Sequence, residues 1–408
     1  MLFRSYCTID RFEVAGRRFP FGGRCSLYEN VWKRKARTAA AQDLVEKRAE
    51  VLFQVTPMRP AATPKHERVE RTYWGVGPAY ESAKAFVRES LGRSAASPVA
   101  SGTRVGIPRA LTTHSLFPLY STFFSHIGME VVLSDVDPRG DLTSHSGFCF
   151  PAQIAHGAVL DLAKKGIGLI FIPHVVRMPH PNQCRDSYLC PITQAGPYFL
   201  AKAFPESRLL SPVLEFINGY ETCSALVDLA VQELGIKREL AVGAWAAAVQ
   251  AQTDAERTLR DFGTQALEAA IAEGRPAILL AGHSYNAFTP EASQSVGKKL
   301  SSMGVTVIPA DCLMPAGEGP TSWHFANQIL NAVGVAKRHP NLFLLSVSNF
   351  SCTIDAFTHS MLASELGSKP YLVLEIDAHT ADAGVQTRLE AFLDIIHNYR
   401  SEEHTSEL

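Results

Sequence analysis

Short runs of apolar residues recur along most of the chain, separated by longer stretches of mixed polarity. The first four runs cover residues 103–108, 129–135, 167–174 and 209–216. The stretches between them, such as LFPLYSTFFSHIG and CFPAQIAHGAVLDLAKKG, have the length and apolar spacing of helices. Continuous apolar strands that alternate with helices are typical of a parallel sheet covered on both faces. This part of the chain therefore predicts an α/β lobe.

The same alternation returns after a long helical stretch. Residues from Lys237 to about Glu273 are rich in Ala, Gln, Glu and Arg. Four further apolar runs follow at residues 276–282, 305–311, 342–350 and 371–378. We therefore predict the α/β fold class, with two doubly wound Rossmann-like lobes at residues 103–236 and 275–399 joined by a helical bridge at 237–274.

The two ends of the chain differ from this body. Residues 1–102 contain a basic run and connectors rich in Pro, Ala and Ser, which predict an N-terminal appendage with a solvated charged face. The last nine residues, 400–408, read RSEEHTSEL, which is the in-frame translation of a common sequencing adapter. We interpret this segment as an artefact, and an ordinary polar tail is the alternative.

Composition narrows the class of protein. Hydrophobic residues make up 46% of the chain and charged residues 19%, so a large core can form. Because 39 Lys and Arg face 40 Asp and Glu, the net charge of -1 favours neither nucleic acid nor an anionic membrane as a partner. The apolar runs are too short for a membrane helix, and the first residues do not resemble a signal peptide. Eight irregularly spaced cysteines indicate a reducing compartment, so we expect a soluble cytoplasmic protein.

Three cysteines fall directly before predicted helices, at the carboxyl ends of predicted strands. They are Cys149 in GFCFPAQIAHG, Cys190 in DSYLCPITQAGP and Cys352 in SNFSCTIDAF. Ligands of open α/β sheets bind at this edge, and a helix start favours the thiolate that a metal requires. Pro151 and Pro191 suit the first turn of a helix. Three such thiolates fit an iron–sulfur site better than a closed zinc site, which usually has four ligands with CxxC spacing. Because the chain contains no CxxC pair, the alternative is that the three cysteines are simply buried as small apolar residues.

Polar residues follow two of the predicted strands in the second lobe. His283, Ser284 and Tyr285 lie in AGHSYNAF, and Glu375 and His379 lie in EIDAHTADAG. We interpret His283, Glu375 and His379 as candidate catalytic acid/base or cofactor-contacting groups. The EIDAHTADAG segment could equally be a capped turn. AGHSYNAF lacks the second glycine of G-x-S-x-G, so serine hydrolysis through Ser284 is not favoured.

The other five cysteines carry weaker signals. Cys223 falls within an amphipathic helical pattern, which predicts a core position. Cys312 follows a predicted strand, and Cys184 shares a loop with Cys190, so both are candidates for additional ligands. Because additional ligands would allow a larger cluster, the number of iron atoms stays open. Cys7 and Cys25 belong to the predicted appendage.

Several motifs together resemble one known family. VGIPRALTTHSLFPLYSTFF, VVLSDVDP, GFCFPAQIAHG, SYLCPITQAGPY, SNFSCTIDAF and KPYLVLEIDAHTADAGVQTRLEAFLD resemble the activase-related (DUF2229-type) region of large acyl-CoA dehydratase activase proteins. That region is similar to the iron–sulfur subunits of 2-hydroxyacyl-CoA dehydratases. The resemblance covers about residues 3–399. It implies two Rossmann-like lobes with an oxygen-sensitive [4Fe-4S] cluster, for which Cys149, Cys190 and Cys352 match the ligand-bearing motifs.

The resemblance also implies partners and a function. An ATP-hydrolysing activase, upstream in the same protein or in trans, would deliver a low-potential electron that comes indirectly from ferredoxin or flavodoxin. The chain itself lacks a P-loop, because SVGKKLSS does not have the required spacing. A CoA ester is the candidate substrate, although GHSYN replaces a segment that commonly reads G-R-P-Y-H in the family. Two interpretations stay open: a component of an acyl-CoA dehydratase or ATP-dependent reductase, or a non-catalytic regulatory or electron-relay module that docks an activase.

Overall fold

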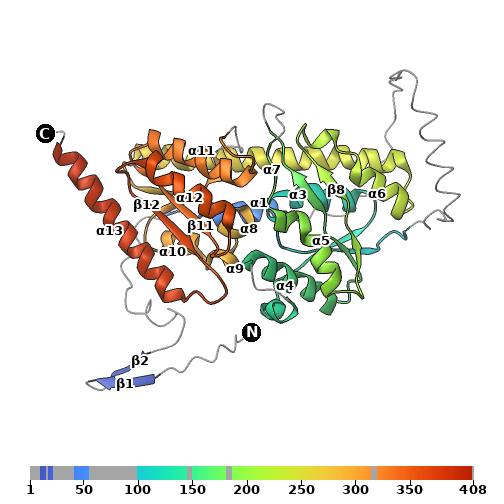
Figure 1. Ribbon diagram of the computed structural model, residues 1–408, viewed down its shortest axis with the longest axis horizontal. Helices are drawn as coiled ribbons and strands as arrows, with labels where there is room; N and C mark the ends of the chain where they lie inside the picture. Colours follow the sequence, from blue (N-terminus) through green and yellow to red (C-terminus); the bar gives the residue numbers. More distant parts are fainter. Residues whose placement is uncertain are drawn as a thin grey trace.

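Two α/β lobes lie side by side and are joined along one face by a long helix (Figure 1). The computed structural model describes residues 10–14, 17–21, 41–54, 99–144, 149–180, 186–313 and 319–406. The lobes contain four-stranded parallel sheets with strand orders β4-β3-β5-β7 and β10-β9-β11-β12. The predicted α/β fold class with two Rossmann-like lobes is confirmed. In both sheets the first strand of the lobe lies between the second and the third, so the two lobes share one strand order.

The first lobe starts at residue 99 of the described chain. Its elements are β3 (Arg104–Ile107), α3 (Thr113–His126), β4 (Glu130–Leu133), η1 (Pro138–Thr143), α4 (Phe150–Lys164), β5 (Leu169–Phe171), β6 (His174–Arg177), α5 (Pro191–Ala203), β7 (Arg208–Leu210), β8 (Val213–Glu215), η2 (Tyr220–Thr222) and α6 (Ala225–Glu233). Two predicted strands, 167–174 and 209–216, are each split in two, and their second halves β6 and β8 form a separate parallel pair. Pro173 and Pro212 stand at the breaks, where proline has no N–H for the ladder.

The second lobe repeats the alternation of strands and helices. Its elements are β9 (Ala277–Ala281), α8 (Ser284–Ala287), α9 (Pro290–Ser293), α10 (Val296–Ser302), β10 (Thr306–Pro309), η3 (Ala310–Cys312), α11 (His324–Arg338), β11 (Leu342–Ser348), α12 (Thr353–Leu366), β12 (Tyr371–Glu375) and α13 (Asp382–Ser406). The central strands β9 and β11 are buried along their whole length, as expected for strands covered by helices on both faces. Helix α13 continues from the lobe through residues 400–406, and Arg400 donates a hydrogen bond to the Gly274 carbonyl.

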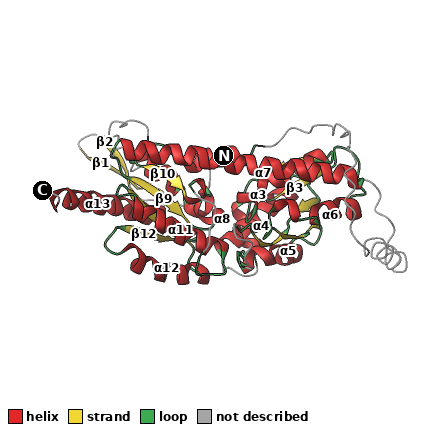
Figure 2. Ribbon diagram, turned by 90° about the horizontal axis from the view of Figure 1, so that it is seen from above, coloured by secondary structure: helices red, strands yellow, loops and turns green. Residues whose placement is uncertain are grey.

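Helix α7 (Arg238–Ala272) connects the lobes and runs along both of them (Figure 2). Its N-terminal half packs Ala244, Trp245 and Ala248 into the core of the first lobe. Its C-terminal half packs Leu259 and Phe262 into the core of the second. Because one continuous helix contributes to both cores, it ties the two lobes together.

Residues 41–54 also belong to the body, although the sequence assigns them to an appendage. Helix α1 (Leu44–Leu52) buries Leu44 and Leu52 in the core of the second lobe. The preceding residue Gln42 accepts a hydrogen bond from Val307 of β10. Within residues 1–40, the structure describes only the antiparallel strands β1 (Asp10–Val14) and β2 (Arg17–Phe21).

Arg48 on α1 links the two lobes. Its side chain is 1% exposed and forms an ion pair with Asp311 of the second lobe, to which both Nε and Nη2 of the guanidinium donate hydrogen bonds. It also donates to the carbonyl of His114 in α3, at 2.9 Å. That carbonyl needs an outside donor because Pro118, four residues later in α3, has no N–H. No helix in the described part of the chain has the length and apolar character of a membrane span.

Candidate metal centre at the lobe boundary

The three predicted ligand cysteines each stand at the N-cap of a helix. Cys149 precedes α4, Cys190 precedes α5 and Cys352 precedes α12. Pro151 and Pro191 occupy the first turns of α4 and α5, as the sequence predicts. The cysteines are free thiols with partly buried side chains, and two come from the first lobe and one from the second. The fold therefore directs three helix starts toward the boundary between the lobes.

The three sulfurs lie near one buried tyrosine, Tyr285. Burial raises the pKa of the Tyr285 hydroxyl well above its usual value, and a negative charge on Cys190, on Cys149 or on Cys352 would act in the same direction. A negative charge on Cys190 would likewise raise the pKa of Cys149 and of Cys352. Charges influence one another in this way only over short distances in a protein. The structure thus brings Cys149, Cys190 and Cys352 close to Tyr285.

The thiols are held in their neutral form. Burial raises the pKa of Cys149 to about 12, although the backbone N–H of Ala152 acts against it. Burial also raises the pKa of Cys190 and of Cys352, and the Asp355 carboxylate adds to the effect on Cys352. The thiolate preference expected from the helix starts is therefore outweighed by desolvation. A bound cation would reverse this balance and release the protons.

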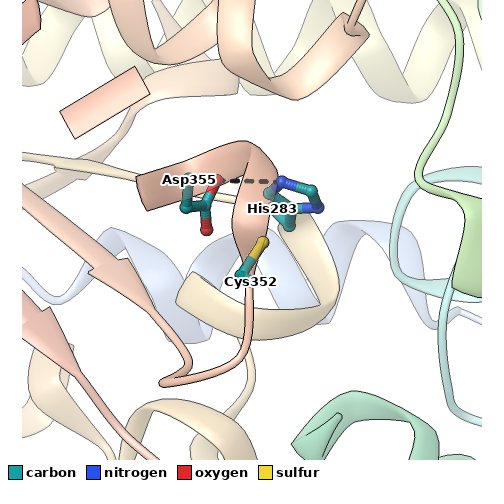
Figure 3. Close-up of side chains that lie close together, drawn as sticks. All are labelled: His283, Cys352 and Asp355. Atoms are coloured by element: carbon teal, nitrogen blue, oxygen red, sulfur yellow. Dashed lines mark ion pairs between the residues drawn. The ribbon is translucent and has the colours of Figure 1, made fainter. Parts of the chain in front are cut away.

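A buried chain of hydrogen-bonding groups includes His283 and Asp355, which Figure 3 shows beside Cys352. The Tyr285 hydroxyl is 2.6 Å from His283 Nδ1, and Thr193 of the first lobe donates to the same hydroxyl at 3.4 Å. On the other side of the ring, His283 Nε2 lies 3.1 Å from Asp355 Oδ1. Ser348 donates to the second oxygen of Asp355 at 2.5 Å. These contacts fit a His283 ring that carries its proton on Nε2, facing the Asp355 carboxylate, and accepts a hydrogen bond from the Tyr285 hydroxyl at Nδ1.

The carboxylate at the end of this chain is ionised. Burial alone would raise the pKa of Asp355, but the nearby His283 ring and the hydrogen bond from Ser348 lower it below its usual value. The 3.1 Å contact between Nε2 and Oδ1 is an ion pair without the alignment of a hydrogen bond, and neither atom has another partner among the described residues. Both atoms therefore keep capacity for a further ligand.

His283, Cys352 and Asp355 together form a group that can bind a metal ion. One ligand atom of each lies within 4.8 Å of the others, as the convergence of the three side chains in Figure 3 illustrates. The group comes from two chain segments. His283 follows β9 after Gly282, whose φ of +144° and close contact with the Val347 carbonyl leave no room for a side chain. Cys352 and Asp355 lie at the start of α12, after β11.

Asp355 was not predicted from the sequence. An acidic residue in the first turn of a helix complements the helix dipole and needs no further role, so it carries little signal. Its position three residues after a candidate ligand cysteine is the feature that could have indicated it.

The other two predicted catalytic residues lie elsewhere. Glu375 ends β12 beside Ser348 of β11, and its charge acts on the half-buried His359. His379 is exposed, and its backbone N–H donates to Asp377 Oδ1 at 2.8 Å in a capped turn, which is the alternative that the sequence left open. Ser284 accepts a hydrogen bond from Ser115 of the first lobe at 2.7 Å.

Two of the remaining cysteines, Cys223 and Cys312, lie in the cores of the lobes. Cys223 is buried in the core of the first lobe. Cys312 is fully buried in the core of the second, with its sulfur 3.7 Å from Asp311 Oδ1. Cys7, Cys25 and Cys184 lie outside the described residues.

The fold and the site define a two-lobed α/β protein with three helix-capping cysteines and a His283, Cys352 and Asp355 group that can bind a metal ion. Residues 104–313 match the family described as CoA enzyme activase uncharacterised domain (DUF2229), and the chain belongs to this family. The resemblance to the activase-related region is therefore confirmed.

The other comparisons add no functional information. No curated protein matches the chain. A crystal structure from Silicibacter pomeroyi DSS-3, provisionally assigned as a phosphosugar isomerase, is 11% identical and aligns over 80% of this chain and 91% of its own. Its TM-score of 0.17 is too low to support any conclusion.

Proposed function

We propose that this chain is the iron–sulfur module of an ATP-driven, low-potential electron-transfer system of the 2-hydroxyacyl-CoA dehydratase and activase type. The observation that carries the proposal is the gathering of Cys149, Cys190 and Cys352, each at a helix start, around Tyr285. Family membership supports an activase- or CoA-related role.

The donor set suits a [4Fe-4S] cluster. Cys149, Cys190 and Cys352 would be its ligands, and thiolate sulfur is the ligand that such clusters prefer. When bound, a cluster of this kind supplies one-electron transfer at a potential that charge and hydrogen bonds tune. Free backbone N–H groups at the starts of α4, α5 and α12 would stabilise negative charge on the sulfurs. With three protein thiolates, a fourth position would stay free for a further ligand, and Asp355 or His283 stands close enough to Cys352 to provide one.

The buried polar chain would hold a proton next to the sulfurs. Tyr285 keeps its proton because burial raises its pKa, and it donates toward His283 Nδ1. Asp355 orients the imidazole from the other side. We assign the acid/base role to the buried His283. Of the two other candidates, Glu375 lies at the end of the neighbouring strand β12, and His379 is exposed, so that it would contact only a ligand at the surface.

The proposal includes partners of stated kinds. An ATP-hydrolysing activase, in the same polypeptide or in trans, would deliver the electron, with ferredoxin or flavodoxin as the indirect donor. A CoA ester would be the substrate, in keeping with the CoA enzyme that the family description names. Oxygen-sensitive chemistry of this kind and the free thiols suit the cytoplasm of an anaerobic cell.

Anaerobic reconstitution tests the proposal. We expect the wild-type protein to retain iron and sulfide in equal amounts and to give an EPR signal after reduction. Cys149→Ala, Cys190→Ala and Cys352→Ala should each lose most of the bound iron, whereas Cys223→Ala, which removes a buried thiol in the core of the first lobe, should retain it. Equal iron content in all four variants would contradict the ligand assignment.

One observation favours the alternative of a non-catalytic electron relay. His379 lies on an exposed capped turn, which leaves His283 as the one candidate base inside the buried chain among the described residues. Adding acyl-CoA esters to the reduced protein separates the two functions. A changed EPR signal in the wild type that is lost in His283→Gln supports catalysis, and identical spectra with and without esters support the relay.

A further inference from the structure

Residues 187–189, directly before Cys190, are connected through their backbone to both lobes. They run antiparallel to β6 of the first lobe. Two backbone hydrogen bonds, at 2.9 and 3.1 Å, join them to Val176 of β6 and to Met178 just after it. The segment therefore lies beside the small parallel pair of β6 and β8 as a further extended stretch.

The second lobe holds the other side of this segment. The Ser322 carbonyl accepts hydrogen bonds from the N–H groups of Ser187 and Tyr188, at 3.2 and 2.9 Å. The N–H of His324, the first residue of α11, donates to the Tyr188 carbonyl at 2.9 Å. The chain that leads into Cys190 is thus bonded to both lobes at once.

Ser187 is the irregular position of the segment. Its φ of +96° lies in a region that residues with a side chain seldom adopt, and such conformations persist only where the surrounding structure enforces them. The Ser187 side chain is buried, and its hydroxyl forms a hydrogen bond of 3.0 Å with Nδ1 of His324. A buried side chain of the second lobe therefore holds the strained residue of the first.

The course of the chain at Ser187 determines where Cys190 lies. Only Tyr188 and Leu189 stand between the two. Leu189 is 1% exposed in the core of the first lobe, and its carbonyl accepts a hydrogen bond from the Gln194 side chain of α5 at 2.7 Å. A relaxation of φ at Ser187 would therefore have to move the cysteine or break these contacts.

We propose that His324 is a positioning residue for Cys190: its hydrogen bond to Ser187 keeps the preceding segment in its strained course, so that the second lobe places a thiol carried by the first. This inference rests on the proposed function only in treating Cys190 as a metal ligand. The position of the thiol in the metal-free protein does not depend on a cluster.

Alkylation of the reduced, metal-free protein tests the role of His324. Iodoacetamide modifies accessible thiols, and mass spectrometry of the peptides follows each cysteine separately. We expect His324→Leu to accelerate modification of Cys190 about tenfold, the factor that one net hydrogen bond corresponds to, and to leave the rate at Cys149 unchanged. His324→Asn should keep the wild-type rate at Cys190, because the asparagine amide can form the hydrogen bond of Nδ1.

Ser187→Gly tests the strain. Glycine adopts a positive φ without a steric penalty, so adding Ser187→Gly to His324→Leu should bring the rate at Cys190 back toward that of the wild type. The control is His114→Leu, which removes another buried histidine with one ring hydrogen bond, on α3, and should not accelerate modification of Cys190.

Three results would overturn the proposal: an unchanged rate at Cys190 in His324→Leu, an equal acceleration at Cys149, or no slowing when Ser187→Gly is added. An acceleration in His114→Leu as large as that in His324→Leu would do the same. Iron content does not enter these measurements, so the assignment of His324 and the proposed cluster can fail separately.

Discussion

At the scale of single residues, Tyr285 lies where the two lobes meet, close to Cys190. Its hydroxyl contacts Thr193 of the first lobe and His283 of the second, and it lies near Cys190. A tyrosine in this position keeps a buried imidazole nitrogen hydrogen-bonded, which a core of apolar residues could not do.

Replacing this hydroxyl should therefore reduce stability. We expect Tyr285→Phe to lower the free energy of unfolding by about 1–3 kcal/mol, because His283 Nδ1 loses its donor while it stays buried. Urea denaturation of the metal-free protein measures the change. Tyr198→Phe is the matched control, since Tyr198 is 73% exposed and its hydroxyl can bond to water. An equal, small effect of both substitutions would show that the buried hydrogen bond contributes nothing.

At the scale of elements, the interruption of α3 explains why α1 and α7 pack where they do. Pro118 breaks the hydrogen-bond ladder of α3, and two side chains complete it from outside. Arg48 of α1 donates to the His114 carbonyl. Gln252 of α7 donates to the Ser115 carbonyl at 2.9 Å and accepts from the Leu119 N–H at 3.3 Å. The irregular helix thus has specific partners on both neighbouring helices.

The amide of Gln252 should be hard to replace. We expect Gln252→Met, which keeps the size of the side chain, to lower the free energy of unfolding by about 2–4 kcal/mol, because two buried backbone groups lose their partners. Gln250→Met, two residues away on the exposed face of the same helix, should stay within about 0.5 kcal/mol of the wild type. Chemical denaturation of both variants provides the comparison, and similar midpoints would refute the role of Gln252.

At the scale of the whole molecule, two buried neutral histidines make stability depend on pH. Burial lowers the pKa of His114 and of His324 to about 3, with Arg109 and Arg48 adding to the effect on His114. The unfolded chain protonates these side chains near pH 6.5, and the folded chain does not until the pH reaches about 3. The unfolded state therefore binds more protons, and stability falls as the pH drops below 6.5.

Between pH 7.5 and 5.5, we expect each histidine to reduce the free energy of unfolding by roughly 1 kcal/mol. Asp355 contributes nothing in this window: its folded pKa is lowered, so its stabilisation is lost only below the ordinary pKa of 3.8. Urea denaturation at the two pH values measures the change. His114→Gln with His324→Gln should flatten the dependence, whereas His397→Gln, at an exposed position, should not. A slope unchanged by the double substitution would contradict this account.

Local sequence was sufficient for most strands and helices of the two lobes and for the placement of three cysteines, but not for the strand breaks at Pro173 and Pro212 or for α1. Apolar runs such as 276–282 and 342–350 form buried strands because burial on both faces selects continuous apolar residues. Cys149 and Cys190 stand at helix starts, since the prolines that follow them suit the first turn. These features depend on neighbours within a few residues of each other.

Only the tertiary structure decided which side chains meet. His283 and Asp355 come together because β9 and β11 are adjacent in the sheet, an order that no local pattern specifies. His379 lies on a similar strand-end turn, yet it points to solvent. The sequence by itself determined the elements and their chemistry, whereas contacts between distant segments required the packed fold, because burial and charge pairing depend on every neighbouring element at once.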